Sequence, residues 1–170
     1  MKRRFSVQVA GPKRAARLYA QALKHARLQP DERGAIFAKL EIALAAGSFE
    51  AAYALGSWYA NGVHVRKNGK KAHQLFVQAA KGRVPEALFN LGYAYEAGKY
   101  GPVDKQSAYL AYLEAALMGD LDATYEVGRC LWHGIGISAD KEAAEVWERV
   151  YVARGGNLEE KDASRRPDRG

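Results

Sequence analysis

A period of 36 residues dominates this sequence. The pair Leu55-Gly56 recurs as Leu91-Gly92 and again as Val127-Gly128, with the same step each time. Repetition at a fixed period of this length is the signature of a repeat architecture. Such repeats contact mainly their neighbours, so the chain is expected to stack them into an array. Other columns keep the step: alanine at 51, 87 and 123 and at 72, 108 and 144; glycine at 62, 98 and 134; Tyr59, Tyr95 and Leu131; Asn68, Asp104 and Asp140.

Each repeat reads as two helices joined by a turn. Ala87, Leu91 and Tyr95 are four residues apart and form one stripe on a helix. Gly98 follows this stripe, as glycine often does just beyond a helix C-terminus. Asp104 then lies four residues before the next apolar column, where its side chain would cap a second helix. Asn68 and Asp140 would do the same in their copies.

Glycine also recurs in the middle of the first helix of each repeat, at 56, 92 and 128. Glycine inside a helix costs about 1 kcal/mol relative to alanine. Its recurrence therefore predicts a neighbouring helix that approaches too closely for a side chain. A glycine closes the second helix in two copies, at Gly47 and Gly119. In the copy over 49–84 the glycine, Gly82, comes one position early, so Arg83 stands in the glycine column.

The repeats define the expected domain organisation. Three copies cover residues 49–84, 85–120 and 121–155, and a degenerate copy covers 13–48, with helices over about 13–28 and 31–46 separated at Pro30. Residues 1–12 form a basic N-terminal segment. Residues 156–170 have no apolar face, and we expect them to be a disordered tail.

Charge and composition constrain the class of protein. The net charge is +7, but residues 1–33 carry nine basic and two acidic side chains, whereas residues 86–155 carry six and eleven. Such asymmetry can steer an acidic partner surface to the basic half. No apolar run reaches the roughly 18–20 residues of a membrane span. With one cysteine and no signal peptide, we expect a cytoplasmic protein that does not contact a membrane.

Residue patterns that carry chemistry are missing. The histidines at 25, 64, 73 and 133 form no metal-binding pair, and Cys130 lies in an apolar column typical of a buried thiol. No nucleophile elbow or phosphate loop is present. The acidic residues Glu142, Glu145 and Glu148 are spaced along one helix and are predicted to be solvated. We expect no enzyme activity, no cofactor and no metal.

The repeated columns resemble the Sel1-like repeat, a relative of the tetratricopeptide repeat. The resemblance rests on Leu91-Gly92-Tyr93-Ala94-Tyr95-Glu96-Ala97-Gly98, then Asp104, Ala108, Ala115-Ala116 and Gly119, and on Gly134-Ile135-Gly136-Ile137, Asp140, Ala144 and Trp147 in the third copy. It implies an all-α, right-handed α-solenoid of about four helix-turn-helix repeats. It also implies a concave surface, lined by the first helix of each pair, that binds another protein.

Some columns on the first helices change identity from copy to copy, as a binding face would. A solvated face under no constraint is the alternative. The expected partner is another protein or peptide held in the groove by a monomeric adaptor or scaffold. The candidate contact residues are Ser57, Asn61, Asn90, Tyr93, Ala97, Glu126, Arg129, Trp132 and His133.

Two other functions remain open at this point. The same fold would suit a bacterial immunity or inhibitor protein that neutralises a toxin, since the resemblance includes such proteins. Phosphates could instead be contacted by the basic residues of the N-terminal segment together with a basic cluster formed by Arg66, Lys67, Lys70, Lys71, Lys81 and Arg83. No aromatic residues are interleaved with that cluster, so at most weak, salt-sensitive nucleic-acid binding is expected.

Overall fold

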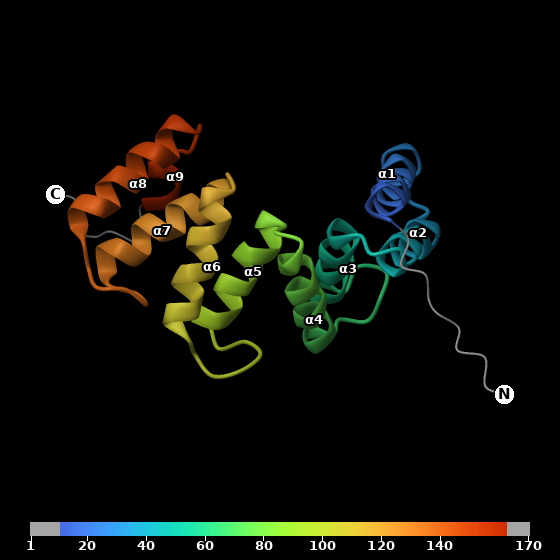
Figure 1. The fold of residues 1–170 in the computed structure, drawn as a ribbon, viewed down its shortest axis with the longest axis horizontal. Coiled ribbons are helices and arrows are strands. Elements are labelled where there is room, and N and C mark those ends of the chain that lie inside the picture. The colour runs from blue at the N-terminus through green and yellow to red at the C-terminus, as the bar shows by residue number, and fades with distance from the viewer. Residues whose placement is uncertain (1–10, 163–170) are drawn as a thin grey trace. The chain divides into compact units, whose positions relative to one another are not determined.

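The structure, a computed structural model, describes residues 11–162, and over this range its regular elements are all helices (Figure 1). This confirms the predicted all-α solenoid of helix pairs. The chain divides into two compact units, one ending at Val84 and the other beginning at Pro85.

Unit 1 contains two helix pairs. Each helix packs against the next one along the chain, and Ala22, Leu40 and Leu55 are among its buried side chains. The first pair is the degenerate copy, whose helices begin and end within about two residues of the predicted positions. The helices are α1 (Pro12–Leu28), α2 (Arg33–Ala45), α3 (Phe49–Asn61) and α4 (Gly69–Lys81).

Unit 2 contains two further pairs and a short final helix. The helices α5 to α8 again pack in chain order, because each amphipathic helix buries its apolar stripe against the next one. Tyr112, Val127 and Cys130 lie fully buried in this unit. The helices are α5 (Pro85–Glu96), α6 (Lys105–Leu117), α7 (Leu121–His133), α8 (Lys141–Ala153) and α9 (Leu158–Asp162).

The predicted capping residues begin the second helix of each pair. The side chains of Asn68, Asp104 and Asp140 accept hydrogen bonds from the backbone N–H three residues later, at 2.9–3.0 Å. These bonds satisfy donors that the first turn of a helix cannot pair itself. Ser48 and Asp120 cap α3 and α7 in the same way, which the sequence reading did not anticipate.

The predicted close approach of a second helix is confirmed at two of the mid-helix glycines, Gly56 and Gly92, and is wrong at Gly128. A Cβ atom at Gly92 would come within 2.6 Å of the Tyr112 ring, and one at Gly56 within 2.8 Å of the Phe76 ring. At Gly128 the nearest atoms would be 3.6 Å away, which is ordinary contact. The difference arises because the third copy has Glu148 in the column that holds the two rings.

Glu148 was predicted to be solvated, and this is wrong. Its residue is only 7% exposed, unlike Glu142 and Glu145 on the same helix. The column of Phe76 and Tyr112 faces the first helix of its own repeat, so a glutamate placed in it is turned toward α7. There the side chain lies near Gly128, whose missing Cβ leaves room for it.

The displaced glycine in the first full repeat also has a structural cause. A Cβ at Gly82 would come within 2.1 Å of the Phe49 ring, so only glycine fits there. The left-handed backbone that ends α4 falls one residue later, at Arg83, whose φ is +58°. Gly47, Gly119 and Gly155 hold the same left-handed position in the other repeats. Arg83 thus carries a backbone strain that these glycines avoid.

The expectation of disorder from residue 156 onward is wrong for part of that segment. Residues 158–162 form α9, and Lys161 contacts α7 through both its side chain and its backbone. Residues 163–170 lie outside the described residues, as do residues 1–10 of the predicted basic N-terminal segment. Within 11–162 no helix has the length and apolar character needed to cross a membrane.

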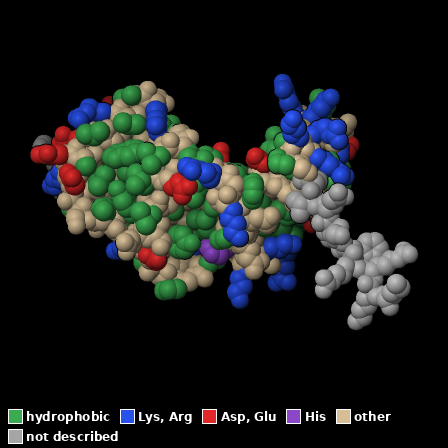
Figure 2. All heavy atoms as spheres, viewed as in Figure 1, with side chains coloured by type: hydrophobic (Ala, Val, Ile, Leu, Met, Phe, Trp, Pro, Cys, Tyr) green, Lys and Arg blue, Asp and Glu red, His purple; other side chains and the backbone are tan. Residues whose placement is uncertain are grey.

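The two units carry opposite charge. Residues 11–84 contain 13 Lys and Arg and four Asp and Glu, a difference of +9, whereas residues 85–162 contain seven and fourteen, a difference of −7. Helix α1 contributes five of the cations and no acid, and Figure 2 shows Lys and Arg side chains gathered over it. Charge of this kind attracts partners of opposite sign to each unit.

Candidate functional site

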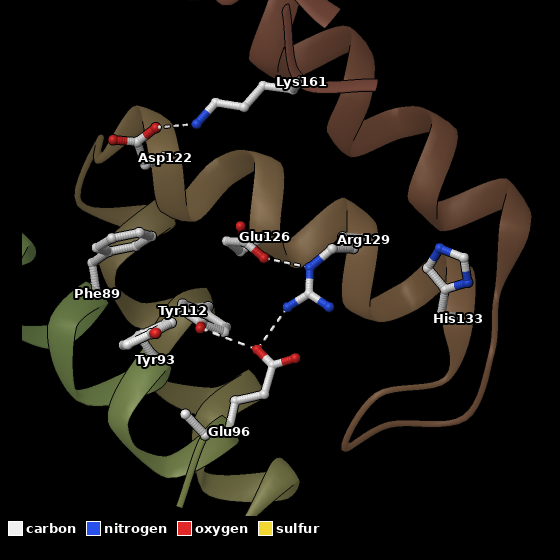
Figure 3. Close-up of a pocket in the computed structure, with 10 residues that line it drawn as sticks. Phe89, Tyr93, Glu96, Tyr112, Asp122, Glu126, Arg129, His133 and Lys161 are labelled. Atoms are coloured by element: carbon white, nitrogen blue, oxygen red, sulfur yellow. Dashed lines mark hydrogen bonds and ion pairs between the residues drawn. The ribbon is translucent and has the colours of Figure 1, made fainter. Parts of the chain in front are cut away.

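Five of the predicted contact residues line one pocket in unit 2, with a volume of about 650 Å³. Tyr93 comes from α5, and Glu126, Arg129 and His133 come from α7 (Figure 3). Ala97 directly follows the last residue of α5. We call this the α5–α7 pocket. Its lining is completed by Phe89, Glu96, Tyr112, Asp122 and Lys161.

Helical spacing explains why these side chains meet. Residues 122, 126, 129 and 133 are four, three and four apart, which places them on one face of α7. On α5, residues 89, 93 and 96 share a face by the same rule, and Ala97 follows the end of the helix. Tyr93 and Arg129 occupy equivalent columns of successive repeats, and so do Ala97 and His133. The pocket is therefore the repeated first-helix face with different side chains on its two walls.

Arg129 joins the two walls. Its guanidinium donates to Glu96 on α5 at 2.6 Å and to the neighbouring Glu126 on α7. Burial alone would lower the pKa of Arg129, but the hydrogen bonds and charges of the two carboxylates outweigh it and raise the pKa further above its usual range. Arg129 is thus a fixed cation whose Nε and Nη2 donors are used within the pocket.

Tyr112 forms the floor. Its hydroxyl donates to Glu96 at 3.1 Å, and its ring lies against Gly92 of α5. Burial, followed by the charges of Glu96 and Glu126, raises the pKa of Tyr112. The phenol therefore stays protonated and acts as a permanent donor. The same ring serves the packing of the repeat and the orientation of a pocket carboxylate.

Helix α9 reaches the rim of the pocket. The Lys161 ammonium lies 2.9 Å from Asp122 and 5.8 Å from the centroid of the Tyr125 ring. The Tyr125 hydroxyl donates to the backbone carbonyl of Lys161 at 3.3 Å, which holds the helix against α7. The hydrogen bond to Asp122 is the main reason why the pKa of Lys161 is raised.

Four predicted contact residues lie outside the α5–α7 pocket. Asn90 donates its amide to the carbonyl of Glu86 in its own helix, at 2.7 Å. Trp132 lies half-buried, with the Lys141 ammonium 5.1 Å from its ring centroid. Ser57 and Asn61 belong to unit 1, where Asn61 donates to the carbonyl of Ser57 at 3.0 Å. Their contact with a partner stays a prediction.

The sequence reading missed Glu96 and Lys161. Glu96 aligns with Trp132, and this column faces the first helix of the following repeat, so Glu96 meets Arg129 on α7. No repeat follows Trp132 in the described residues, so its ring meets Lys141 instead. The change of residue type in this column was the available signal for Glu96. Lys161 gave none, because five residues are too few to show a helical period.

The thiol of Cys130 and the imidazoles of His25 and His73 lie outside the α5–α7 pocket. Cys130 is fully buried, and burial raises the pKa of its thiol to about 12. His25 lies between Glu32 and Lys39 and hydrogen bonds with both. Burial lowers the pKa of His73. Within residues 11–162 no three His, Cys, Asp or Glu side chains are grouped in a way that could hold a metal ion.

Comparison with known proteins decides the family. The Sel1 repeat model matches residues 49–83, 85–120 and 121–147, which is more than half of the chain. The chain belongs to the Sel1 repeat family. Sel1 repeats are non-catalytic scaffolds that generally mediate protein–protein interaction.

Solved structures of other Sel1 repeat proteins are similar to this chain. A Sel1 repeat protein from Oxalobacter formigenes is 30% identical with a TM-score of 0.67, over 72% of this chain and 92% of that one. The protective antigen c5321 from uropathogenic Escherichia coli is 25% identical with a TM-score of 0.76, over 85% of this chain but only 31% of its own length. Helicobacter pylori cysteine rich protein B, at 22% identity and a TM-score of 0.56 over 69% of this chain and 90% of that one, shares the fold.

Proposed function

We propose that this Sel1 repeat protein is a non-enzymatic adaptor that binds a segment of a partner protein in the α5–α7 pocket. The observation that carries the proposal is the meeting of non-repeating columns in that pocket. Columns that build the solenoid keep their residue type, whereas Tyr93 and Arg129, or Ala97 and His133, differ between repeats. These columns are not needed for packing between repeats, and they line a pocket. Such a surface is suited to bind a peptide segment.

The side chains of the pocket fit this role. Tyr93 is 55% exposed and offers an aromatic surface of the kind that anchors protein interfaces. Arg129, Glu96 and Tyr112 are held in place by one another, so a partner meets a preorganised surface. Preorganisation lowers the entropic cost of binding.

The test is a pull-down with the full chain as bait and Tyr93→Ala as the variant. The matched control is Leu110→Ala on α6, because Leu110 is 54% exposed and lies outside the pocket. We expect a partner that the wild-type chain and the control both retain and that Tyr93→Ala loses. Equal retention of the partner by all three proteins would show that the partner does not bind in the α5–α7 pocket.

The charge of unit 1 supports a second candidate, the binding of an anionic partner such as nucleic acid. The Lys71 ammonium lies 4.2 Å from the centroid of the Tyr59 ring, which places an aromatic side chain beside the basic cluster of α4. Phosphate contacts of this kind weaken steeply with salt. A gel shift at low salt that disappears in the variant Lys70→Gln with Lys71→Gln would support this candidate, and no shift at low salt would remove it.

A further inference from the structure

We infer that the segment bound in the α5–α7 pocket is basic, and that Lys161 of α9 occupies in cis the place of one of its cationic side chains. This inference rests on the proposed function and names the chemistry of its partner. It is carried by the charges that line the pocket and by the way in which α9 is held.

The carboxylates of the pocket outnumber its cations. Glu96, Asp122 and Glu126 face Arg129 and Lys161. Arg129 already donates to two of the carboxylates, so an incoming anion would gain little from it and would lie beside Glu96 and Glu126. An incoming cation would instead be attracted by the carboxylates of Glu96 and Glu126. The net charge of −7 over residues 85–162 favours its approach as well.

The Lys161 contact shows how the pocket accepts an ammonium group. Asp122 provides the ion pair at 2.9 Å (Figure 3). The Tyr125 ring provides an aromatic surface, with its centroid 5.8 Å from the ammonium. Rings attract cations through their negative faces. Further along the pocket, Tyr93 and Phe89 could pack against the aliphatic stem of a second Lys or Arg side chain.

Helix α9 is suited to be displaced. It has five residues, too few for a helix that is stable by itself, and Gly155-Gly156 precede it. Its ion pair is partly exposed, since the side chains of Lys161 and Asp122 are 37% and 59% accessible. Exposed ion pairs hold weakly. When Lys161 leaves, Asp122 loses its cation and the pocket gains one more site for a basic side chain.

The first test measures binding of a fluorescein-labelled peptide of about twelve alternating Gly and Lys residues to the full chain. Salt is kept at about 0.15 M so that charges beyond roughly 8 Å are screened. We expect the double variant Glu96→Gln with Glu126→Gln to weaken binding about tenfold. Glutamine can still accept hydrogen bonds from Arg129, so its donors keep their partners while the two negative charges are removed.

The matched control neutralises two carboxylates of the same unit outside the pocket, with Glu142→Gln and Glu145→Gln on α8. These residues are exposed, and the net charge changes by the same amount. We expect less than about a twofold effect. Equal losses in the two double variants would show general attraction to unit 2 and would overturn the inference. So would failure of the wild-type chain to bind the peptide.

The second test addresses α9. Lys161→Ala frees Asp122 and is expected to tighten peptide binding severalfold, whereas Lys161→Arg keeps the cation and leaves binding unchanged. Unchanged or weaker binding by Lys161→Ala would overturn the role of Lys161. The pull-down separates the two levels: if Tyr93→Ala loses a partner but the pocket glutamines do not, the pocket binds a partner and the basic chemistry is wrong.

Discussion

At the scale of single residues, the glycines record how closely two helices meet. Gly92 and Gly128 hold the same column of successive repeats, but only Gly92 faces a ring, that of Tyr112. Tyr112 is buried and its hydroxyl is bound to Glu96, so the ring cannot swing away cheaply. Replacing the mid-helix glycine by a residue with a side chain should therefore have a different effect on stability in the two copies.

This difference predicts opposite effects of one substitution. Gly92→Ala is expected to destabilise the protein by up to about 2 kcal/mol, because overpacking a core costs about 1–3 kcal/mol and the helix-propensity gain offsets about 1 kcal/mol of this. Gly128→Ala meets its nearest atoms at 3.6 Å and is expected to stabilise by up to about 1 kcal/mol. Urea denaturation of both variants measures this. Destabilisation of equal size in both would contradict the argument.

Arg83 offers a measurement of backbone strain. Its φ of +58° disfavours any residue that carries a Cβ. We compare Arg83→Gly with Arg83→Ala, because both lose the contacts of the arginine side chain and only the alanine keeps a Cβ. The glycine variant is expected to be more stable by about 1 kcal/mol. Equal midpoints of thermal unfolding would show that the strain is absent.

At the scale of elements, the turns position the helices as much as the apolar stripes do. In the turn before α8, Gly136 has a φ of +72°, and a Cβ there would lie 1.9 Å from the carbonyl oxygen of Lys105 at the start of α6. The turn of one repeat thus rests directly on the helix start of the repeat before it. This backbone contact fixes how α7 and α8 stack on α6.

Gly136→Ala should therefore cost more than most surface substitutions. A Cβ against backbone has no flexible neighbour to yield, so we expect a loss of about 2 kcal/mol or more. Gly101→Ala is the control, since Gly101 lies in the corresponding turn of the previous repeat with no atom within 4 Å of its Cβ position. Chemical denaturation should separate the two variants. A neutral effect of Gly136→Ala would show that the turn moves freely on α6.

The helices and their contacts also show which features could be predicted from the sequence. The 36-residue period and the capping residues Asn68, Asp104 and Asp140 predicted the helices, because both signals can be read from the sequence without knowing which side chains are in contact. The equivalent columns of Tyr93 and Arg129 placed both residues on the predicted contact face, and both line the α5–α7 pocket. The Glu96–Arg129 pair spans 33 residues in the chain, and the change of residue type in the column of Glu96 does not name Arg129 as its partner. Helix α9 depends on contacts with Tyr125 and Asp122 rather than on its own sequence pattern.

At the scale of the whole molecule, the division into two units has a thermodynamic consequence. In repeat proteins, stability is approximately a sum of repeat terms and nearest-neighbour terms, so parts of an array can open separately. Here one compact unit ends at Val84 and the next begins at Pro85, a residue without a backbone N–H. We expect the two units to behave as separate cooperative units in hydrogen exchange.

Two matched glycine variants test this directly. Gly56→Ala places a Cβ 2.8 Å from the Phe76 ring in unit 1, and Gly92→Ala places one 2.6 Å from the Tyr112 ring in unit 2. Gly56→Ala should speed amide exchange about tenfold in α1 to α4 and leave α5 to α8 unchanged, and Gly92→Ala should do the reverse. A tenfold change corresponds to about 1.4 kcal/mol, within the cost of overpacking. Faster exchange in all of these helices for either variant would mean that the array unfolds as one unit, and a partner bound in the α5–α7 pocket would then stabilise both halves rather than unit 2 alone.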